Sequence, residues 1–213
     1  MSTQVGLREL KKQRTRQQIA DTAWRLFAER GFDAVPVAEI AREAEVSEAT
    51  VFNYFPTKED LVFHRMEAFE QELLDALRDR PEGESIVQAF GRFALNPRGF
   101  LASNDPGATE GMRTVARVMT GSPALQTRQR EIFERFTGTL ASLVAEELGM
   151  AAEDVEPWVI ANALIGLHRA LISYTHRQAL AGVSNRRIAR NVVTDGQRAL
   201  DRLEHGIGAV SDP

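Results

Sequence analysis

A stretch of sixteen residues near the N-terminus combines aromatic side chains with groups that bind polar, negatively charged partners. The stretch, VSEATVFNYFPTKEDL, places Phe52, Tyr54 and Phe55 within four positions, close to hydroxyl side chains and to Lys58. One interpretation is a buried helix with irregular patterning. The other is a helix with one buried face and an opposite face that meets something polar and negatively charged.

Other residue types predict neither catalysis nor a metal site. Cysteine is absent, which removes disulfides, thiolate nucleophiles and Cys-ligated zinc. His168 and His176 stand two turns apart on one expected helix, too distant to share a metal without further ligands. No Gly-rich phosphate loop follows a strand, and no Ser-His-acid order comes with a supporting motif. We therefore expect no enzyme activity, no metal and no cofactor.

Composition is that of a folded globular protein. Of 213 residues, 43% are apolar and 26% are charged, which is too apolar for a disordered chain. No run of eighteen apolar residues predicts a membrane span, and the basic N-terminus lacks the apolar segment of a secretory signal. Together with the missing cysteines, these features favour a cytoplasmic protein without membrane partners.

Charge is distributed unevenly along the chain. The net charge is −4, but residues 1–30 hold seven Lys or Arg against three acids, a local charge of +4. The remaining 183 residues therefore carry −8. A basic end on an acidic body can bind phosphate locally, because charges beyond a Debye length are screened. A merely solvated basic face would show the same pattern.

Apolar periodicity near 3.6 predicts an all-α fold of about nine helices. We expect an N-terminal helix-turn-helix domain over residues 1–60, with a basic arm at 8–16, and a larger helical domain over 61–213. Breakers such as Pro81 and Gly83 separate the helices. The expected helices cover 9–30, 36–44, 48–55, 57–77, 84–95, 107–120, 122–148, 153–181 and 184–207.

The second and third helices are joined by only about three residues, which is the spacing of a helix-turn-helix motif. Ser47 is the expected N-cap of the third helix, with Thr50 at its third position. Helical spacing puts Val51 and Phe55 on the buried side. It leaves the other side chains of this helix outward or lateral, so Phe52 and Tyr54 are available to a partner.

The stretch RTRQQIADTAWRLFAERGFDAVPVAEIAREAEVSEATVFNYFPTKEDLV, residues 14–62, strongly resembles the N-terminal domain of the TetR family of transcriptional regulators. The likeness includes LFAERGFDA, VAEIAREA, TVFNYF and TKEDL in this order. The resemblance implies a DNA-binding regulator. It places groove-facing, phosphate-contacting or arm roles on Arg14, Arg16, Ser47, Glu48, Ala49, Thr50, Phe52, Asn53, Tyr54 and Lys58.

Individual roles follow from matching positions. Glu48 and Ala49 occupy base-reading positions, and a carboxylate there could accept from cytosine N4. Lys58 matches a lysine that contacts backbone phosphate beside a helix N-terminus. Two positions depart from the family: Pro36 replaces a frequent threonine, and Glu45 replaces a usual glycine that tolerates positive φ. Both departures put the full set of phosphate contacts in doubt.

The last two helices carry apolar stripes that suit pairing with a second copy. The resemblance implies that they form a four-helix bundle in a two-fold homodimer. The same stripes could instead serve only the core of one chain. The expected interface residues are Ala161, Ile165, Ile172, Ile188, Val192, Ala199 and Leu203.

The region 84–158 is rich in Phe and Met, and in this family such helices enclose a small-molecule cavity. Plain core is the competing interpretation of the same stripe. A hydrophobic or amphipathic effector of unknown identity is expected as the ligand. The expected lining residues are Phe90, Phe93, Met112, Met119, Phe136, Trp158, Asn162 and His168.

The sequence thus predicts a homodimeric regulator, a repressor released from a palindromic double-stranded DNA operator by a small organic ligand. The hypothetical mechanism is that ligand binding shifts the helix 57–77 and changes the separation of the two recognition helices. Successive major grooves lie about 34–36 Å apart, so this separation controls binding. The alternatives are a helical adaptor that binds protein, or an all-α enzyme, in which the motif no longer reads DNA.

Overall fold

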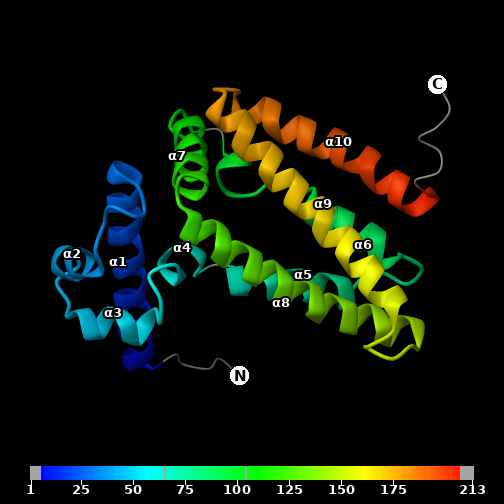
Figure 1. Ribbon diagram of the computed structural model, residues 1–213, viewed down its shortest axis with the longest axis horizontal. Coiled ribbons are helices and arrows are strands. Elements are labelled where there is room, and N and C mark those ends of the chain that lie inside the picture. The colour runs from blue at the N-terminus through cyan, green and yellow to red at the C-terminus, as the bar shows by residue number, and fades with distance from the viewer. Residues whose placement is uncertain (1–5, 65, 104, 207–213) are drawn as a thin grey trace. The chain divides into compact units, whose positions relative to one another are not determined.

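The computed structural model describes residues 6–64, 66–103 and 105–206. Within these ranges the chain forms ten α-helices and one short 3-10 helix and contains no strand, which confirms the all-α prediction (Figure 1). The elements are α1 (Leu7–Arg30), α2 (Val37–Glu43), α3 (Glu48–Tyr54), α4 (Asp60–Phe63), α5 (Met66–Arg78), α6 (Ile86–Ala94), η1 (Gly99–Leu101), α7 (Ala108–Gly121), α8 (Pro123–Leu148), α9 (Val155–Leu180) and α10 (Asn185–His205).

The described residues of the helix expected over 57–77 are assigned to α4 and α5, and Arg65 between them lies outside the described residues. Before α4, Thr57 and Asp60 form the expected reciprocal pair: the Thr57 N–H donates to the Asp60 carboxylate at 2.9 Å, and the Asp60 N–H donates to the Thr57 hydroxyl at 3.2 Å. This pair fixes the turn that leads into α4.

Contacts group the chain into two compact units that do not follow a single cut in the sequence. Unit 1 contains residues up to Glu67 together with Val118–Gln126, and unit 2 contains Ala68–Arg117 and the residues from Thr127 onward. The helices α7 and α8 therefore each begin in one unit and end in the other. The division between residues 60 and 61 stays a prediction, and tertiary contacts group residues 61–67 and 118–126 with unit 1.

Unit 1 is built on α1, which packs on both α2 and α4. Ile19, Ala23 and Phe27 are fully buried on its inner face, as the apolar periodicity predicts. The helix ends at Gly31, whose φ of 82° and N–H bond to the Phe27 carbonyl allow the chain to turn back. Phe32 then lies with its ring 5.0 Å from that of Phe27. The result is a core that holds the next two short helices.

Segment 118–126 is anchored in unit 1 by a buried hydroxyl. Ser122, which is 1% exposed, donates to the Asp33 carboxylate at 2.7 Å, and Val118 and Leu125 are buried beside it. Asp33 lies directly after the C-terminus of α1. The corner between α7 and α8 is therefore tied to the loop that precedes α2.

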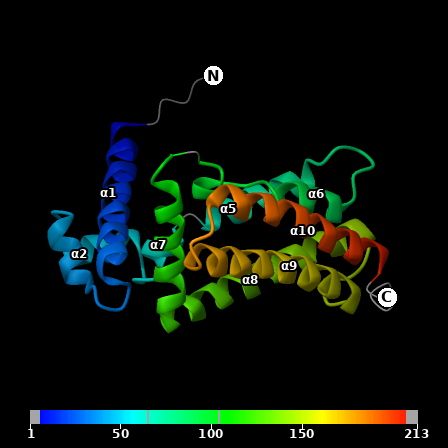
Figure 2. The same ribbon diagram turned by 90° about the horizontal axis from the view of Figure 1, so that it is seen from above.

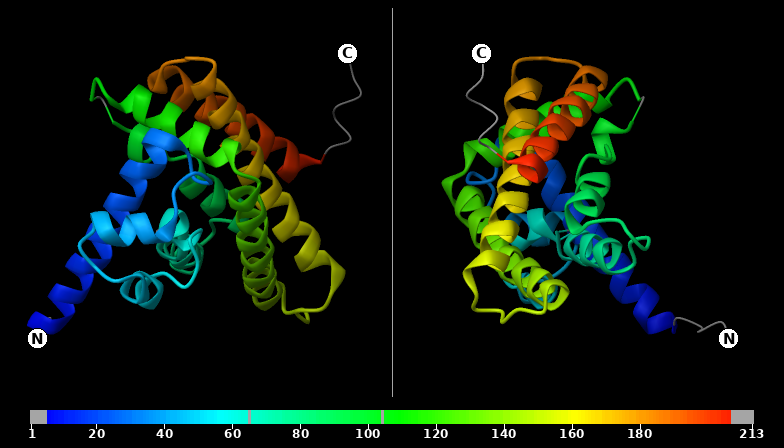
Figure 3. Two further views of the ribbon diagram at one scale, coloured as in Figure 1. Left: turned by 60° about the vertical axis from the view of Figure 1, so that its left-hand side comes forward. Right: turned by 90° about the vertical axis from the view of Figure 1, so that its right-hand side faces the viewer.

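Unit 2 contains an antiparallel hairpin of α9 and α10, which run side by side in every view (Figures 2 and 3). Gly182, with φ of 78°, lies in the turn between them. The main core gathers residues of α5, α6, α8, α9 and α10, among them the fully buried Leu73, Phe90 and Leu140. A close approach of α6 to α10 leaves no room for side chains at Gly91 and Gly196, where an added Cβ would lie 2.4 and 2.3 Å from Leu200 and Leu95.

No helix in the described part of the chain is both long and apolar enough to cross a membrane.

Candidate nucleic-acid interface and ligand cavity

The turn between α2 and α3 is a Schellman motif with an acidic residue in the place usually taken by glycine. The N–H of Val46 donates to the Ala41 carbonyl at 2.9 Å, and that of Glu45 donates to the Arg42 carbonyl at 3.1 Å. Glu45 adopts φ of 55° and is the one described non-glycine residue with positive φ. The departure seen in the sequence thus coincides with a left-handed backbone, which costs an L-residue about 1–2 kcal/mol relative to its usual regions.

Helix α3 begins and packs as its sequence predicts. The Ser47 hydroxyl accepts from the Thr50 N–H at 3.1 Å, so Ser47 is the N-cap. Val51 and Phe55, four residues apart, are each 1% exposed and bury one face of the helix in unit 1. The rest of the helix is consequently held outward on a rigid support.

The outward face of α3 carries the predicted DNA-contacting side chains. Glu48, Ala49 and Asn53 are exposed, and Thr50 and Tyr54 are half-buried. Phe52 leaves 45% of its surface exposed, which is unusual for so large an apolar side chain. These residues form one continuous surface on consecutive turns, as a helix that enters a major groove requires.

Helix α1 fixes the position of the motif through polar contacts. The Gln18 amide donates to the Ala44 carbonyl at the end of α2, at 3.0 Å. Arg25 pairs with Glu43 and Arg30 with Glu39, both across the interface of α1 and α2. Two carboxylates of α2 are therefore paired with arginines, which lessens their repulsion of a polyanion.

Lys58 is directed back toward its own unit. Its ammonium donates to the Phe32 carbonyl at 2.6 Å and lies 4.2 Å from the centre of the Phe32 ring. Burial lowers its pKa, while Asp33 and Glu59 act in the opposite direction. The predicted phosphate contact requires this side chain to turn outward or to act from its position beside Phe32.

The basic arm lies on the first half of α1. Arg14 is exposed, and the Arg16 guanidinium lies 5.4 Å from the ring centre of Phe55, the residue that anchors α3. Arg16 is therefore held close to the C-terminal end of α3, and Arg14 extends from the same helix.

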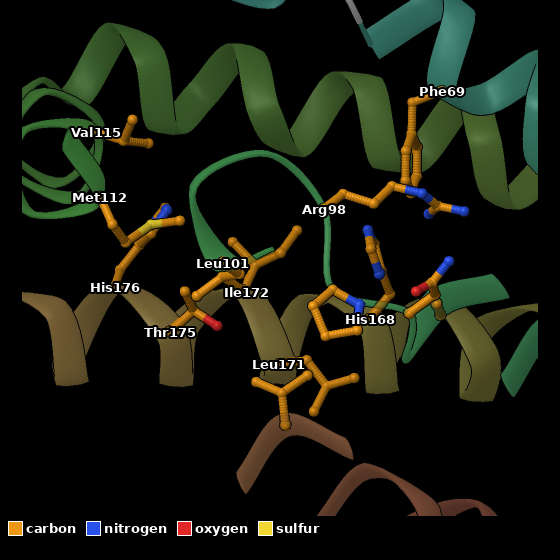
Figure 4. A pocket seen from close by; sticks show the side chains of 14 residues that line it. Phe69, Arg98, Leu101, Met112, Val115, His168, Leu171, Ile172, Thr175 and His176 are labelled. Atoms are coloured by element: carbon orange, nitrogen blue, oxygen red, sulfur yellow. The ribbon is translucent and has the colours of Figure 1, made fainter. Parts of the chain in front are cut away.

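Unit 2 contains a cavity of about 220 Å³. Its walls come from α5, the end of α6, the loop before η1, η1 itself, α7, α9 and α10 (Figure 4). One end presents Phe69, Arg98 and His168, and the other presents Met112, Val115 and His176. Leu101, Ile172 and Thr175 lie between the two ends.

Two of the predicted lining residues, Met112 and His168, line this cavity, and six do not. Phe90, Phe93 and Phe136 are buried in the unit 2 core and are absent from the cavity lining. Met119 belongs to unit 1. Trp158 is 41% exposed and donates to the Ala152 carbonyl, while Asn162 is exposed and donates to the Trp158 carbonyl. A Phe and Met stripe alone does not separate core from cavity.

Arg98 is the cavity residue that sequence reasoning missed. Arg92, Arg113 and Arg117, which stand on the helices of this region, are absent from the cavity lining. Arg98 lies instead in the stretch NPRG between two helices. The one sequence feature that could have indicated Arg98 is its place in a loop, because binding residues often lie on loops between rigid helices.

The predicted dimer stripe lies largely inside the chain. Ala161, Ile165, Ile188 and Val192 are 0–6% exposed, so they cannot contact a second copy in this arrangement. Ile172 and Val192 line the cavity, and Ile172, Ala199 and Leu203 are partly exposed. The apolar period was read correctly, but the face it marks packs against the helices of the same chain.

The short helix pair, its tight turn and the outward face of α3 define a helix-turn-helix DNA-binding protein. Residues 19–64 match the family model described as bacterial regulatory proteins, tetR family, and residues 98–206 match that of the MftR C-terminal domain. The chain belongs to the TetR family, and it is a DNA-binding transcriptional regulator.

Individual relatives agree with this assignment. The chain is 32% identical over 155 residues to the HTH-type transcriptional regulator TcmR of Streptomyces glaucescens, covering 70% of this chain and 67% of TcmR. It is 55% identical over 47 residues to LuxR of Vibrio harveyi, covering 22% and 23% of the two chains. The structure resembles NalD, the secondary repressor of the MexAB-OprM multidrug efflux pump in Pseudomonas aeruginosa, with a TM-score of 0.55, 21% identity and coverage of 91% and 97%.

Metal chemistry has no support among the side chains that can be described: they include no group of three or more His, Asp or Glu that could hold an ion.

Proposed function

We propose that this regulator is a homodimeric repressor, which binds a palindromic operator through α3 and is released by a small ligand in the unit 2 cavity. The observation that carries the DNA-binding part is the exposed surface of Phe52, Asn53 and Glu48 on a helix whose opposite face is fully buried. This exposed face matches the groove-facing turns of a recognition helix.

A two-fold dimer would double this surface, which is small in a single motif. The exposed face of α9 suits such pairing. Val159 is 60% exposed, and Gly166 and Ala170 follow on the same side of the helix without burial. An added Cβ at Gly166 meets no atom within 4 Å, so another helix could approach closely. This face replaces the predicted stripe as the proposed interface.

The route from ligand to DNA follows the two chain segments that line the cavity and lead into unit 1. Phe69 stands on α5, three residues after Met66, and Met112 and Val115 stand on α7, whose last turn belongs to unit 1. The α7 end is tied to Asp33 through Ser122. A ligand that binds one arrangement of α5 and α7 better than another would shift the population of DNA-binding states. This proposal keeps the hypothesis that ligand binding shifts the segment 57–77 and adds α7 as a second segment.

The first test is a footprint of the purified protein on the DNA upstream of its own gene and of neighbouring genes, at two salt concentrations. A protected palindrome with half-sites one helical turn apart, and an affinity that falls with salt, is the expected result. Asn53→Ala should weaken binding about tenfold or more, because a good base contact contributes about 1–3 kcal/mol. Gln197→Ala, an exposed amide on α10, is the matched control.

Lys58→Ala tests the phosphate assignment separately. A phosphate contact predicts weaker binding on every sequence and a smaller salt slope. If the salt dependence of DNA affinity did not change, Lys58 would have only a structural role, through its contacts with Phe32. No protection by a folded protein at either salt concentration would reject the DNA-binding proposal.

The oligomeric state is tested by light scattering during gel filtration. Gly166→Glu should convert a dimer to a monomer, because it places a charge at the centre of the proposed interface. Gly107→Glu is the control, since Gly107 also has open space around its Cβ but lies outside α9. Equal behaviour of the two variants would contradict an interface on this face of α9.

A further inference from the structure

One end of the cavity in unit 2 is cationic, because it holds Arg98, and the opposite end combines the apolar Met112 and Val115 with the imidazole of His176. Arg98 and His168 lie close together beneath Phe69, while Met112 and Val115 lie at the opposite end (Figure 4). Among the lining residues that the structure describes are Arg98, His168 and His176, and none of those described is Asp or Glu. A ligand in this cavity would therefore meet positive charge without a competing carboxylate from the wall.

Arg98 is positioned but not neutralised. Its Nη1 donates to the Phe93 carbonyl at 3.1 Å, and its Cζ lies 3.7 Å from the ring centre of Phe93 and 5.6 Å from that of Phe69. Among the ion pairs of the described residues, none includes Arg98. Two aromatic rings and one carbonyl thus hold a guanidinium whose remaining N–H groups can bind an anion in a forked geometry.

His168 supplies a second polar group at the same end. It is 9% exposed and lies between the ring of Phe69, stacked at 5.3 Å, and the ring of Phe133, edge-on at 5.9 Å. Its Nδ1 is buried without a hydrogen-bond partner among the described residues. A buried polar atom in this condition costs free energy, so a turn of the imidazole that lets a ligand in the cavity bind this nitrogen would be favourable.

Size limits the ligand. The cavity volume of about 220 Å³ lies below the roughly 300–1,000 Å³ of sites for drug-sized molecules. The apolar body of the ligand would extend past Ile172 toward Met112.

We infer that the effector is a small amphipathic monoanion, a carboxylate in the simplest case, whose head group pairs with Arg98 and the imidazole of His168 and whose apolar body reaches Met112 and Val115. This inference rests on the proposed ligand-responsive function and specifies its ligand class. A cationic effector is disfavoured by Arg98, and a purely apolar one would leave both polar groups unpaired.

The test uses the full-length protein and matched probes in isothermal titration calorimetry: hexanoate against hexanamide, and benzoate against benzamide. Each pair has the same shape and differs in charge. We expect the carboxylates to bind about tenfold or more tightly than the amides, because a charged hydrogen bond contributes about 1.5–3 kcal/mol. Acetate, which lacks the apolar body, should bind more weakly than hexanoate.

Variants assign the preference to the site. Arg98→Gln should remove the preference for carboxylates, while Arg92→Gln, which changes the same charge on α6 outside this cavity, should keep it. Met112→Trp, which fills the apolar end, should abolish binding of both members of each pair. This second variant keeps the test valid if circular dichroism shows that Arg98→Gln does not fold.

Three results would overturn the inference: equal binding of carboxylate and amide, equal binding of acetate and hexanoate, or no binding of any probe by the folded protein. None of these results affects the footprint, which is measured without a probe. Conversely, a protein that binds hexanoate through Arg98 but protects no DNA would reject the proposed function and leave this inference standing.

Discussion

The surface of α3 and the wall of the unit 2 cavity place functional side chains in opposite surroundings. On α3 the candidate DNA contacts are exposed, and Val51 and Phe55 on the other face hold the helix in place. In the cavity, His168 is at once a lining residue and part of the packing between Phe69 and Phe133. In unit 1, the residues that would contact DNA differ from those that hold the fold together. In unit 2, the same residues would bind the ligand and pack the core.

This difference has consequences for mutation. A change on the outer face of α3 should alter DNA binding with little effect on the free energy of unfolding, since exposed substitutions usually change it by less than about 0.5 kcal/mol. A change in the cavity wall should alter ligand binding and stability together.

The largest expected effect contrasts two phenylalanines of the same motif. Phe55→Ala should lower the free energy of unfolding by about 3–5 kcal/mol, because it removes a fully buried ring. Phe52→Ala should leave it within about 0.5 kcal/mol while weakening operator binding. Urea denaturation and footprinting measure the two properties. A large stability loss in Phe52→Ala would show that reading and folding are not separated on α3.

The next effect concerns pH and unit 2. Burial first, and the Arg98 charge second, lower the pKa of His168 from 6.5 to about 4. In the unfolded chain His168 therefore takes up a proton as the pH falls through 6.5, while in the folded chain its imidazole stays neutral until about pH 4. Stability from this group is complete above pH 6.5 and should decline by about 3 kcal/mol as the pH falls to 4.

Denaturation at several pH values, with His168→Phe alongside, checks this expectation. The variant should lose most of the decline, although His176, whose pKa burial also lowers, should leave a remainder. His205→Gln, at the exposed end of α10, is the control and should keep the full decline. An identical pH profile in wild type and His168→Phe would mean that His168 does not link the cavity to stability.

A smaller effect tests the close packing of α6 and α10. Gly196→Ala should cost about 1–3 kcal/mol, because its Cβ would lie 2.3 Å from Leu95 in a filled interface. Gly138→Ala, in the middle of α8, would make only an ordinary contact with Trp158 at 3.6 Å. It should gain up to about 1 kcal/mol from helix propensity. Equal changes in urea stability for both variants would contradict the tight contact.

The sequence predicted unit 1 better than unit 2, because the two units depend on different kinds of contact. The features of unit 1 are local: the cap at Ser47, the turn at Glu45 and the i, i+4 pair of Val51 and Phe55 can be derived from neighbouring residues. In α9 both faces carry apolar or small residues, and only contacts far apart in sequence decide which face is inside. The stripe through Ile165 was therefore assigned to a second copy, although it packs within the chain.

The smallest expected effect is at the turn before α3. Glu45→Gly should stabilise the protein by about 0.5–1 kcal/mol. It removes about 1–2 kcal/mol of left-handed strain from the folded state. The greater freedom of glycine in the unfolded chain offsets about 0.4–1 kcal/mol of that gain. Glu45→Ala keeps the positive φ and removes only the carboxylate, so it should bring no such gain in urea denaturation.

The same pair of variants separates two effects on DNA. If the carboxylate repels phosphate, both Glu45→Gly and Glu45→Ala should bind the operator more tightly, most clearly at low salt. If strain in the turn misplaces α3, only Glu45→Gly should do so. If Glu45→Gly raised operator affinity without raising stability, Glu45 would act like the exposed DNA-contacting residues of unit 1. If it raised both, this turn would be a place in unit 1 where DNA binding and folding are coupled.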